Sequence, residues 1–188
     1  MSALVDLIVG QARNNAWANH RLLGVCKALT PEEFAAARTG FFPSLRATLN
    51  HIFLIDTYYI RALEHDPAVL ELYRSPAPGF PDAGQLYEAQ RASDRRLIAF
   101  CERQTEASLA EGLVLPRPNR TPPPTSVASI LEHLFQHQIH HRGQAHAMLS
   151  STSVKPPQLD EFFLAGEEQL PRVVARREEL RALGLPET

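Results

Sequence analysis

The sequence predicts an all-α protein built around a four-helix bundle, with short additional helices near its C-terminal end. Apolar residues recur at helical spacing along most of the 188 residues. Capping residues and prolines divide the chain into four long helical stretches, at about 4–29, 44–65, 82–109 and 126–150. Only residues 112–115, Gly-Leu-Val-Leu, have the character of a short extended segment. A sheet-based fold is therefore not expected.

The spacing of apolar residues and the residues that start or end helices predict the first two long helices. One inward face of the first helix is formed by residues at helical spacing: Ile8, Ala12, Asn15, Asn19, Leu22, Cys26 and Leu29. Thr30-Pro31 ends this stretch, and Pro43-Ser44 opens the second helix. That helix is expected to end before Asp66-Pro67.

The third and fourth long helices are separated from their neighbours by proline-rich connections. A loop over 75–81 precedes Asp82, the expected N-cap of the third helix. Five prolines between Leu115 and Pro124 predict a helix-free connection, after which Thr125-Ser126 caps the fourth helix. Short helical segments are expected over about 158–183, and all 188 residues are expected to form one domain.

Composition excludes several classes of function. The net charge is only −2 and no block of basic residues is present, which argues against nucleic-acid binding. No apolar stretch approaches the roughly 20 residues that cross a bilayer. Asp6 and Arg13 interrupt any N-terminal signal-like segment, and the two cysteines are too few for a disulfide framework. We therefore expect a cytoplasmic protein without membrane or nucleic-acid partners.

Four of the eight histidines lie between His133 and His141, on the fourth long helix. At about 100° per residue, His137 and His141 fall within the apolar stripe of that helix, whereas His133 and His140 lie on its border. The inward two are spaced i, i+4, one turn apart, so they could share an ion. The alternative is a pair of core histidines that bond to neighbouring side chains or water.

The third ligand is expected from another long helix. His51 is the best candidate, because it shares an inward face of the second helix with residues such as Ile55. The remaining candidates, His20, His65 and His146, are expected at the surface.

Other metal motifs do not fit. The residue after His137 is Gln138, so the pair lacks the glutamate of a His-Glu-x-x-His motif. No Glu-x-x-His occurs, which excludes a ferritin-like di-iron site. A site of one divalent ion on His51, His137 and His141 remains. Zn²⁺ or Ni²⁺ is the expected ion, with Fe, Mn and Cu as alternatives.

Four stretches together resemble the DinB-like (DinB/YfiT-type) superfamily of metal-binding bundles. The most specific is His137 to Gln144, His-Gln-Ile-His-His-Arg-Gly-Gln. The others, in the expected order, are 15–19, 44–52 and 156–160. The resemblance implies a four-helix bundle with one divalent ion on His51, His137 and His141. It also implies a homodimer.

Members of this superfamily include thiol-dependent enzymes, such as maleylpyruvate isomerases and bacillithiol S-transferases. An ion on three imidazoles keeps an open position at which it could activate water or bind a thiol as thiolate, so we expect either a transferase that uses a low-molecular-weight thiol or a hydrolase. The alternative is a non-catalytic or stress-response protein in which the metal is structural or sensory. A structural zinc usually has four protein ligands, so three histidines favour an open site.

Three polar residues near the ligands have two interpretations each. Gln144 and Asn50 could orient water or substrate, or they could form hydrogen bonds that support the ligands and helix packing. Arg142 falls on the far side of the apolar stripe, where it is expected to contact a helix or a second subunit.

Overall fold

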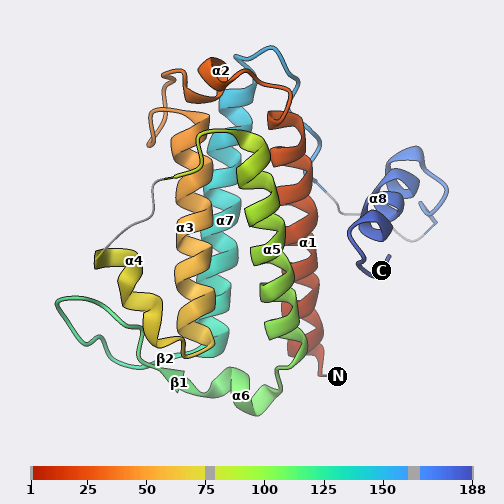
Figure 1. Ribbon diagram of the computed structural model, residues 1–188. Helices are drawn as coiled ribbons and strands as arrows, with labels where there is room; N and C mark the ends of the chain where they lie inside the picture. The colour runs from red at the N-terminus through yellow and green to blue at the C-terminus, as the bar shows by residue number, and fades with distance from the viewer. Residues whose placement is uncertain (1, 75–78, 161–165, 188) are drawn as a thin grey trace.

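The computed structural model describes residues 2–74, 79–160 and 166–187 (Figure 1). Its four long helices are α1 (Ala3–Cys26), α3 (Leu45–Leu63), α5 (Ala83–Glu102) and α7 (Val127–Leu149). In the described residues the strands amount to one short pair, so the predicted all-α fold class is confirmed.

Shorter elements connect the long helices. They are α2 (Pro31–Ala35), the 3₁₀ helix η1 (Pro67–Leu70), α4 (Glu71–Arg74), α6 (Glu106–Ala110), β1 (Gly112–Leu113), β2 (Thr125–Ser126) and α8 (Pro171–Ala182). β1 pairs antiparallel with β2, with Gly112 opposite Ser126. The extended segment expected near 112–115 is thus half of a two-stranded ladder.

All four long helices begin at side-chain caps. Ser2, Ser44, Asp82 and Ser126 each accept a hydrogen bond from the backbone N–H three residues later. Each cap satisfies one donor that the first turn of a helix leaves free. The predicted starts of these helices are accordingly accurate to within a residue.

Helix ends differ more from the sequence prediction. The helix expected over 82–109 is interrupted, because α5 ends at Glu102 and Thr105 caps α6. Thr105 and Ser108 form a reciprocal capping box, which favours a new start over continuation. Of the C-terminal segments expected over 158–183, residues 158–160 are not helical and residues 161–165 lie outside the described residues. The segment after Pro171 is helical, as predicted.

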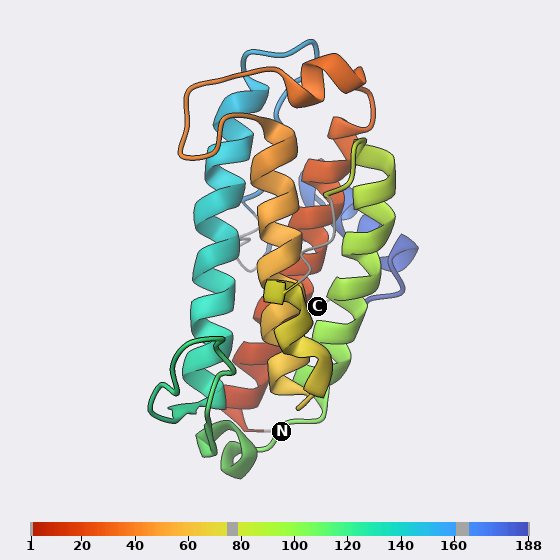
Figure 2. The same ribbon diagram turned by 60° about the vertical axis from the view of Figure 1, so that its left-hand side comes forward.

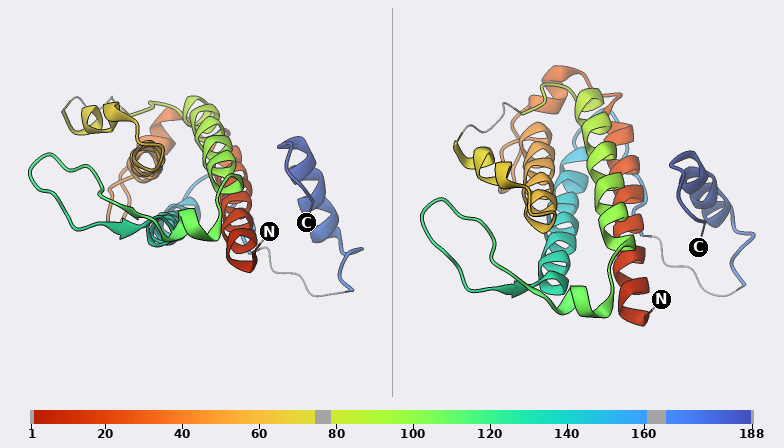
Figure 3. Two further views of the ribbon diagram at one scale, coloured as in Figure 1. Left: turned by 90° about the horizontal axis from the view of Figure 1, so that it is seen from below. Right: turned by 60° about the horizontal axis from the view of Figure 1, so that its bottom comes forward.

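The long helices form a ring in which α3 packs on α5 and α7, and α1 packs on the same two helices. Following the colours of Figures 1 and 2, α1 and α7 run in one direction and α3 and α5 in the other. The view from below in Figure 3 shows β1, β2 and α6 at one end of the bundle and α8 beside α1. The last turn of α3 and the first turn of α5 lie at opposite ends of the bundle (Figure 1).

The core has two apolar clusters with polar residues between them. One cluster joins the first half of α1 to the second halves of α3 and α5, and the other occupies the opposite end of the bundle. Between them lie seven buried polar side chains, which we call the polar layer: Asn15, Asn19, Asp56, Gln90, Asp94, Gln138 and Arg142. All four long helices contribute to this layer.

α8 is attached to the bundle through Trp17. The Trp17 Nε1–H donates a 2.6 Å hydrogen bond to Glu179, which also lies 3.4 Å from Arg21. Leu180 packs against Trp17 and Ala18. Trp17 is therefore buried against α8 and does not lie on an open side of the bundle.

Candidate metal centre

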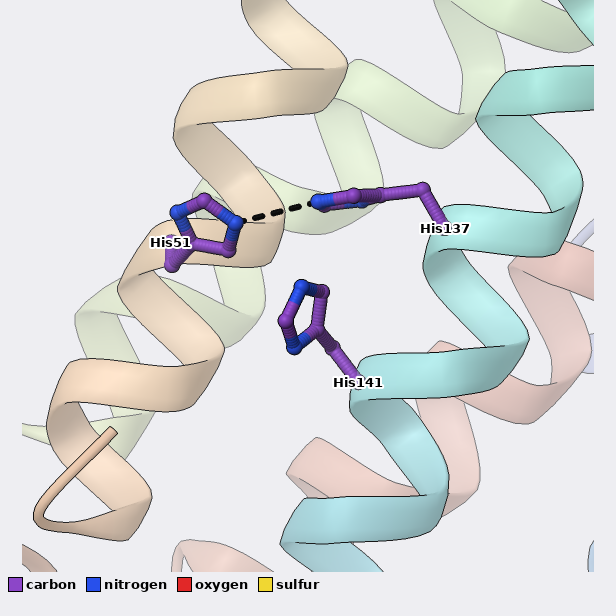
Figure 4. A group of neighbouring side chains, drawn as sticks. All are labelled: His51, His137 and His141. Atoms are coloured by element: carbon purple, nitrogen blue, oxygen red, sulfur yellow. Dashed lines mark hydrogen bonds between the residues drawn. The ribbon is translucent and has the colours of Figure 1, made fainter. Parts of the chain in front are cut away.

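The antiparallel pair α3 and α7 brings three histidines together. Figure 4 shows His51 projecting from α3 toward His137 and His141 of α7. One nitrogen from each ring lies within 4.8 Å of the others, and the Nε2 atoms of His51 and His137 are 3.0 Å apart. The i, i+4 spacing on α7 thus presents two rings to the single ring of α3.

The three rings surround a common point. Their centroids are 4.5 to 5.0 Å apart, and no two rings are parallel. His141 is buried, whereas His51 and His137 are half-buried. The group therefore lies at the edge of the bundle, where one side remains within reach of small molecules.

Gln144 fixes the orientation of His141. The Nδ1–H of His141 donates a 2.8 Å hydrogen bond to the Gln144 side-chain oxygen. Because Nδ1 carries the proton, the lone pair is on Nε2, the nitrogen available to a metal. The amide nitrogen of Gln144 lies 3.0 Å from Nε2 of His140, so Gln144 bridges the two rings.

Burial favours the neutral form of two of these imidazoles, those of His51 and His137. Burial and then the neighbouring histidines lower the pKa of His137 to about 3. Burial also lowers the pKa of His51, with His141 contributing. Neutral rings have free lone pairs at physiological pH, which is the form in which histidine binds metals.

The donor set fits one divalent ion. Two nitrogens each about 2.1 Å from a tetrahedral ion are separated by about 3.4 Å, close to the observed 3.0 Å between His51 and His137. Imidazole nitrogens suit Zn²⁺ and Ni²⁺, and also Fe and Cu. The geometry does not distinguish among these ions.

Besides His140, four further histidines lie outside this cluster. His133 is exposed and lies edge-on to Tyr59, with ring centroids 5.4 Å apart. His20 is half-buried and bonds the Tyr87 hydroxyl at 2.6 Å, which makes it less exposed than the sequence suggested. His65 is exposed with a positive φ of 57° just after α3, and His146 bonds the Pro157 carbonyl at 2.9 Å.

Asn50 lies on α3 beside His51, and its side chain bonds to the Arg46 carbonyl of α3 and to the connection before α5. Its side chain accepts from the Phe80 N–H at 2.6 Å and donates to the Phe80 carbonyl at 3.1 Å. Gly79 lies so close that a Cβ there would come within 2.7 Å of the Asn50 side-chain oxygen. Asn50 therefore has the packing role, one of the two interpretations of the sequence.

Sequence reasoning missed most of the polar layer. Arg142 is 6% exposed and donates to Asn15, Asn19 and Gln138, so it lies inside the bundle. The far side of the α7 apolar stripe faces α1, which is why this position is buried. The sequence does contain a signal that could have predicted the polar layer, namely polar residues paired at i, i+4 on inward helix faces. These pairs are Asn15 with Asn19, Gln90 with Asp94, and Gln138 with Arg142.

Comparison with known proteins agrees with the architecture. The sequence model of the DinB family matches residues 3–172. Protein DinB of Bacillus subtilis (strain 168) is 26% identical over 144 residues, which cover 72% of this chain and 80% of the relative. The region that the family model matches includes all three clustered histidines. Across the residues that the structure describes, helices long and apolar enough to cross a membrane are absent.

Proposed function

The chain belongs to the DinB family, and on this basis we propose that it is an enzyme whose single divalent ion activates a thiol or a water molecule. The ion, Zn²⁺ or Ni²⁺, is held by His51, His137 and His141. The observation that carries the proposal is the convergence of three imidazoles, rather than four protein ligands, at the bundle edge. Three ligands leave a position for a substrate.

When bound, such an ion lowers the pKa of a coordinated water to about 7 or holds a coordinated thiol deprotonated. The chain's own residues prepare this chemistry. Imidazole ligands carry no negative charge, so they would leave the full charge of a bound ion to act on an incoming group. Gln144 holds His141 in the required tautomer.

A thiol nucleophile would have to come from outside the protein. Cys26 and Cys101 are both fully buried, and burial raises the pKa of each thiol to about 12. Neither cysteine supplies a thiolate at neutral pH. This favours a low-molecular-weight thiol as co-substrate, in the cytoplasm, where such thiols are kept reduced.

The decisive test is turnover by metal-loaded protein. We expect transfer of a small thiol to an electrophile, measured as loss of free thiol, with the His141→Ala protein as the inactive control. Hydrolysis of esters or amides without any thiol transfer would replace the transferase proposal by the hydrolase one.

A non-catalytic protein with a structural or sensory ion is the second candidate. It would require a filled coordination shell, which X-ray absorption spectroscopy of the metal-loaded protein can count. A fourth protein ligand would exclude the enzyme proposal, whereas a small-molecule ligand at that position would support it.

We also propose that two copies pair through α1 and α7. Leu7 and Ile139, each 58% exposed, lie on these neighbouring helices and present apolar surface that a partner would cover. Light scattering after size exclusion should give a dimer for the parent and a monomer for Ile139→Glu. A monomeric parent would exclude the pairing.

A further inference from the structure

Two consecutive phenylalanines lie against the histidine cluster. The ring of Phe42 is 4.4 Å from that of His51 and 5.5 Å from that of His141, centroid to centroid. Phe41 is 6.5 Å from His141 and contacts Phe42 edge-on at 4.9 Å. These rings come from the connection between α2 and α3, which crosses the ends of α3 and α7 in Figure 2.

Phe41 is unusual in its exposure. It is 77% exposed, more than any other large apolar side chain in the described residues. Phe42, by contrast, is half-buried against the histidines. An exposed aromatic ring beside an ion with an open position provides an apolar wall for whatever the ion binds.

The connection that carries these rings is held in place at its base. The Arg38 N–H donates a 2.8 Å hydrogen bond to the Pro43 carbonyl, which closes the backbone around residues 39–42. The Arg38 guanidinium donates to the carbonyls of Glu33 and Ala36, and to Ser151 beyond α7. These bonds position the two rings before any ligand arrives.

Close packing around Gly40 further restricts the position of the connection between α2 and α3. A Cβ on Gly40 would collide with the methyl group of Met148, so the backbone next to Phe41 rests directly on α7. Immediately afterwards Ser44 caps α3, which carries His51 seven residues later. The aromatic wall and the first ligand are thus built by one continuous segment.

We propose that the site takes ligands in which an apolar, preferentially aromatic, group is attached close to the atom that binds the ion, and that Phe41 determines this specificity. The proposal rests on the proposed function, because it requires an open position on the ion. The metal-binding atom of the ligand would occupy the open position of the ion held by the three histidines. The apolar group of the ligand would then cover the exposed face of Phe41. A ligand with a polar substituent in place of the apolar group would not make this contact with Phe41.

The test compares two hydroxamates on the zinc-loaded protein by isothermal titration calorimetry. Phenylacetohydroxamate and acetohydroxamate have the same metal-binding atoms and differ in the phenyl ring. We expect the parent protein to bind the phenyl compound roughly three- to ten-fold more tightly, the range typical of one aromatic contact. Cyclohexylacetohydroxamate distinguishes an aromatic preference from a merely apolar one.

Three variants isolate the contribution of Phe41. Phe41→Ala should remove most of the preference while zinc affinity, measured by chelator competition, stays unchanged. Phe41→Leu should retain an apolar but not an aromatic preference. Val174→Ala is the control: it truncates an exposed apolar side chain that lies on α8, and it should behave like the parent.

The outcomes separate the two proposals. If neither hydroxamate binds zinc-loaded protein, the site has no open position, and the proposed function fails together with this inference. If both bind with equal affinity, or if Phe41→Ala keeps the full preference, the inference alone is overturned.

Discussion

Gln138 donates a hydrogen bond to Asp56 across the interface of α7 and α3, one residue along the chain from His137. Gln90 of α5 donates to the same carboxylate oxygen at 2.8 Å. The next turn of α7 repeats the pattern, because Arg142 enters the polar layer and the adjacent His141 faces His51. On α7, polar-layer residues thus alternate with clustered histidines: Gln138 next to His137, and Arg142 next to His141. The contacts that hold α7 in the bundle therefore also set the positions of these two histidines.

Replacing Asp56 by Ala should destabilise the metal-free protein by about 2–4 kcal/mol. The change leaves the amide of Gln138 without its acceptor and removes one of the two acceptors of the Gln90 amide, of which Asp94 remains. Urea denaturation followed by circular dichroism measures this loss. Asp56→Asn keeps one acceptor oxygen and should cost less. Equal stability of the parent and Asp56→Ala would contradict the structural role of the layer.

The pH dependence of stability should reveal the same carboxyl groups. Burial raises the pKa of Asp56 to about 8 and that of Asp94 to about 7, well above the usual range of a carboxyl group. The folded protein therefore holds protons that the unfolded chain releases, and the free energy of unfolding falls as pH rises through these values.

We expect this decline in the metal-free protein from about pH 7 to 8.5, above the range in which unfolded histidines titrate. Urea denaturation at several pH values measures it. Asp56→Asn should flatten the slope, because one of the two titrating groups is removed. Stability that rises over this interval in the parent would disprove the assignment.

Elemental analysis should find close to one equivalent of metal in the purified parent protein. His141→Ala should lose most of it, because two remaining imidazoles hold a divalent ion weakly. His146→Ala is a suitable control, since His146 lies on the same helix but bonds to Pro157. Equal metal content in parent and His141→Ala would refute the ligand assignment.

Gln144→Ala should weaken metal binding by about 10- to 100-fold without abolishing it, as expected for loss of a residue that orients a ligand. The 2.8 Å hydrogen bond to His141 would be lost, and the ring would be free to turn. Chelator competition measures the affinity. His140→Ala removes the other partner of Gln144 and should have a smaller effect. If His140→Ala weakened metal binding more than Gln144→Ala does, the proposed role of Gln144 in orienting His141 would be wrong.

Glu179→Ala should loosen α8 from the bundle. Its carboxylate bonds the indole of Trp17, and no second tryptophan is present to complicate the fluorescence signal. We expect a red shift of the emission as Trp17 gains contact with water, together with faster proteolysis near α8. Glu178→Ala, at an exposed neighbouring position, should leave both unchanged.

The sequence by itself determined the helices and the inward histidines. Period, caps and prolines locate α1, α3, α5 and α7, because these signals act within a few residues of the chain. The i, i+4 spacing places His137 and His141 on one face of α7, whatever that helix packs against. His51 could be chosen because an inward histidine on a second helix is unusual.

Only the tertiary structure decided which helices are neighbours, and three features depend on that. Arg142 is buried because α1 covers the far side of the α7 apolar stripe, where the sequence left a helix contact and a subunit contact as alternatives. Asp56 and Asp94 meet within one layer, although they lie on different helices. Phe41 reaches the histidines because the connection before α3 folds back over the end of α7. Such contacts join residues far apart in the chain, and local periodicity carries no information about them.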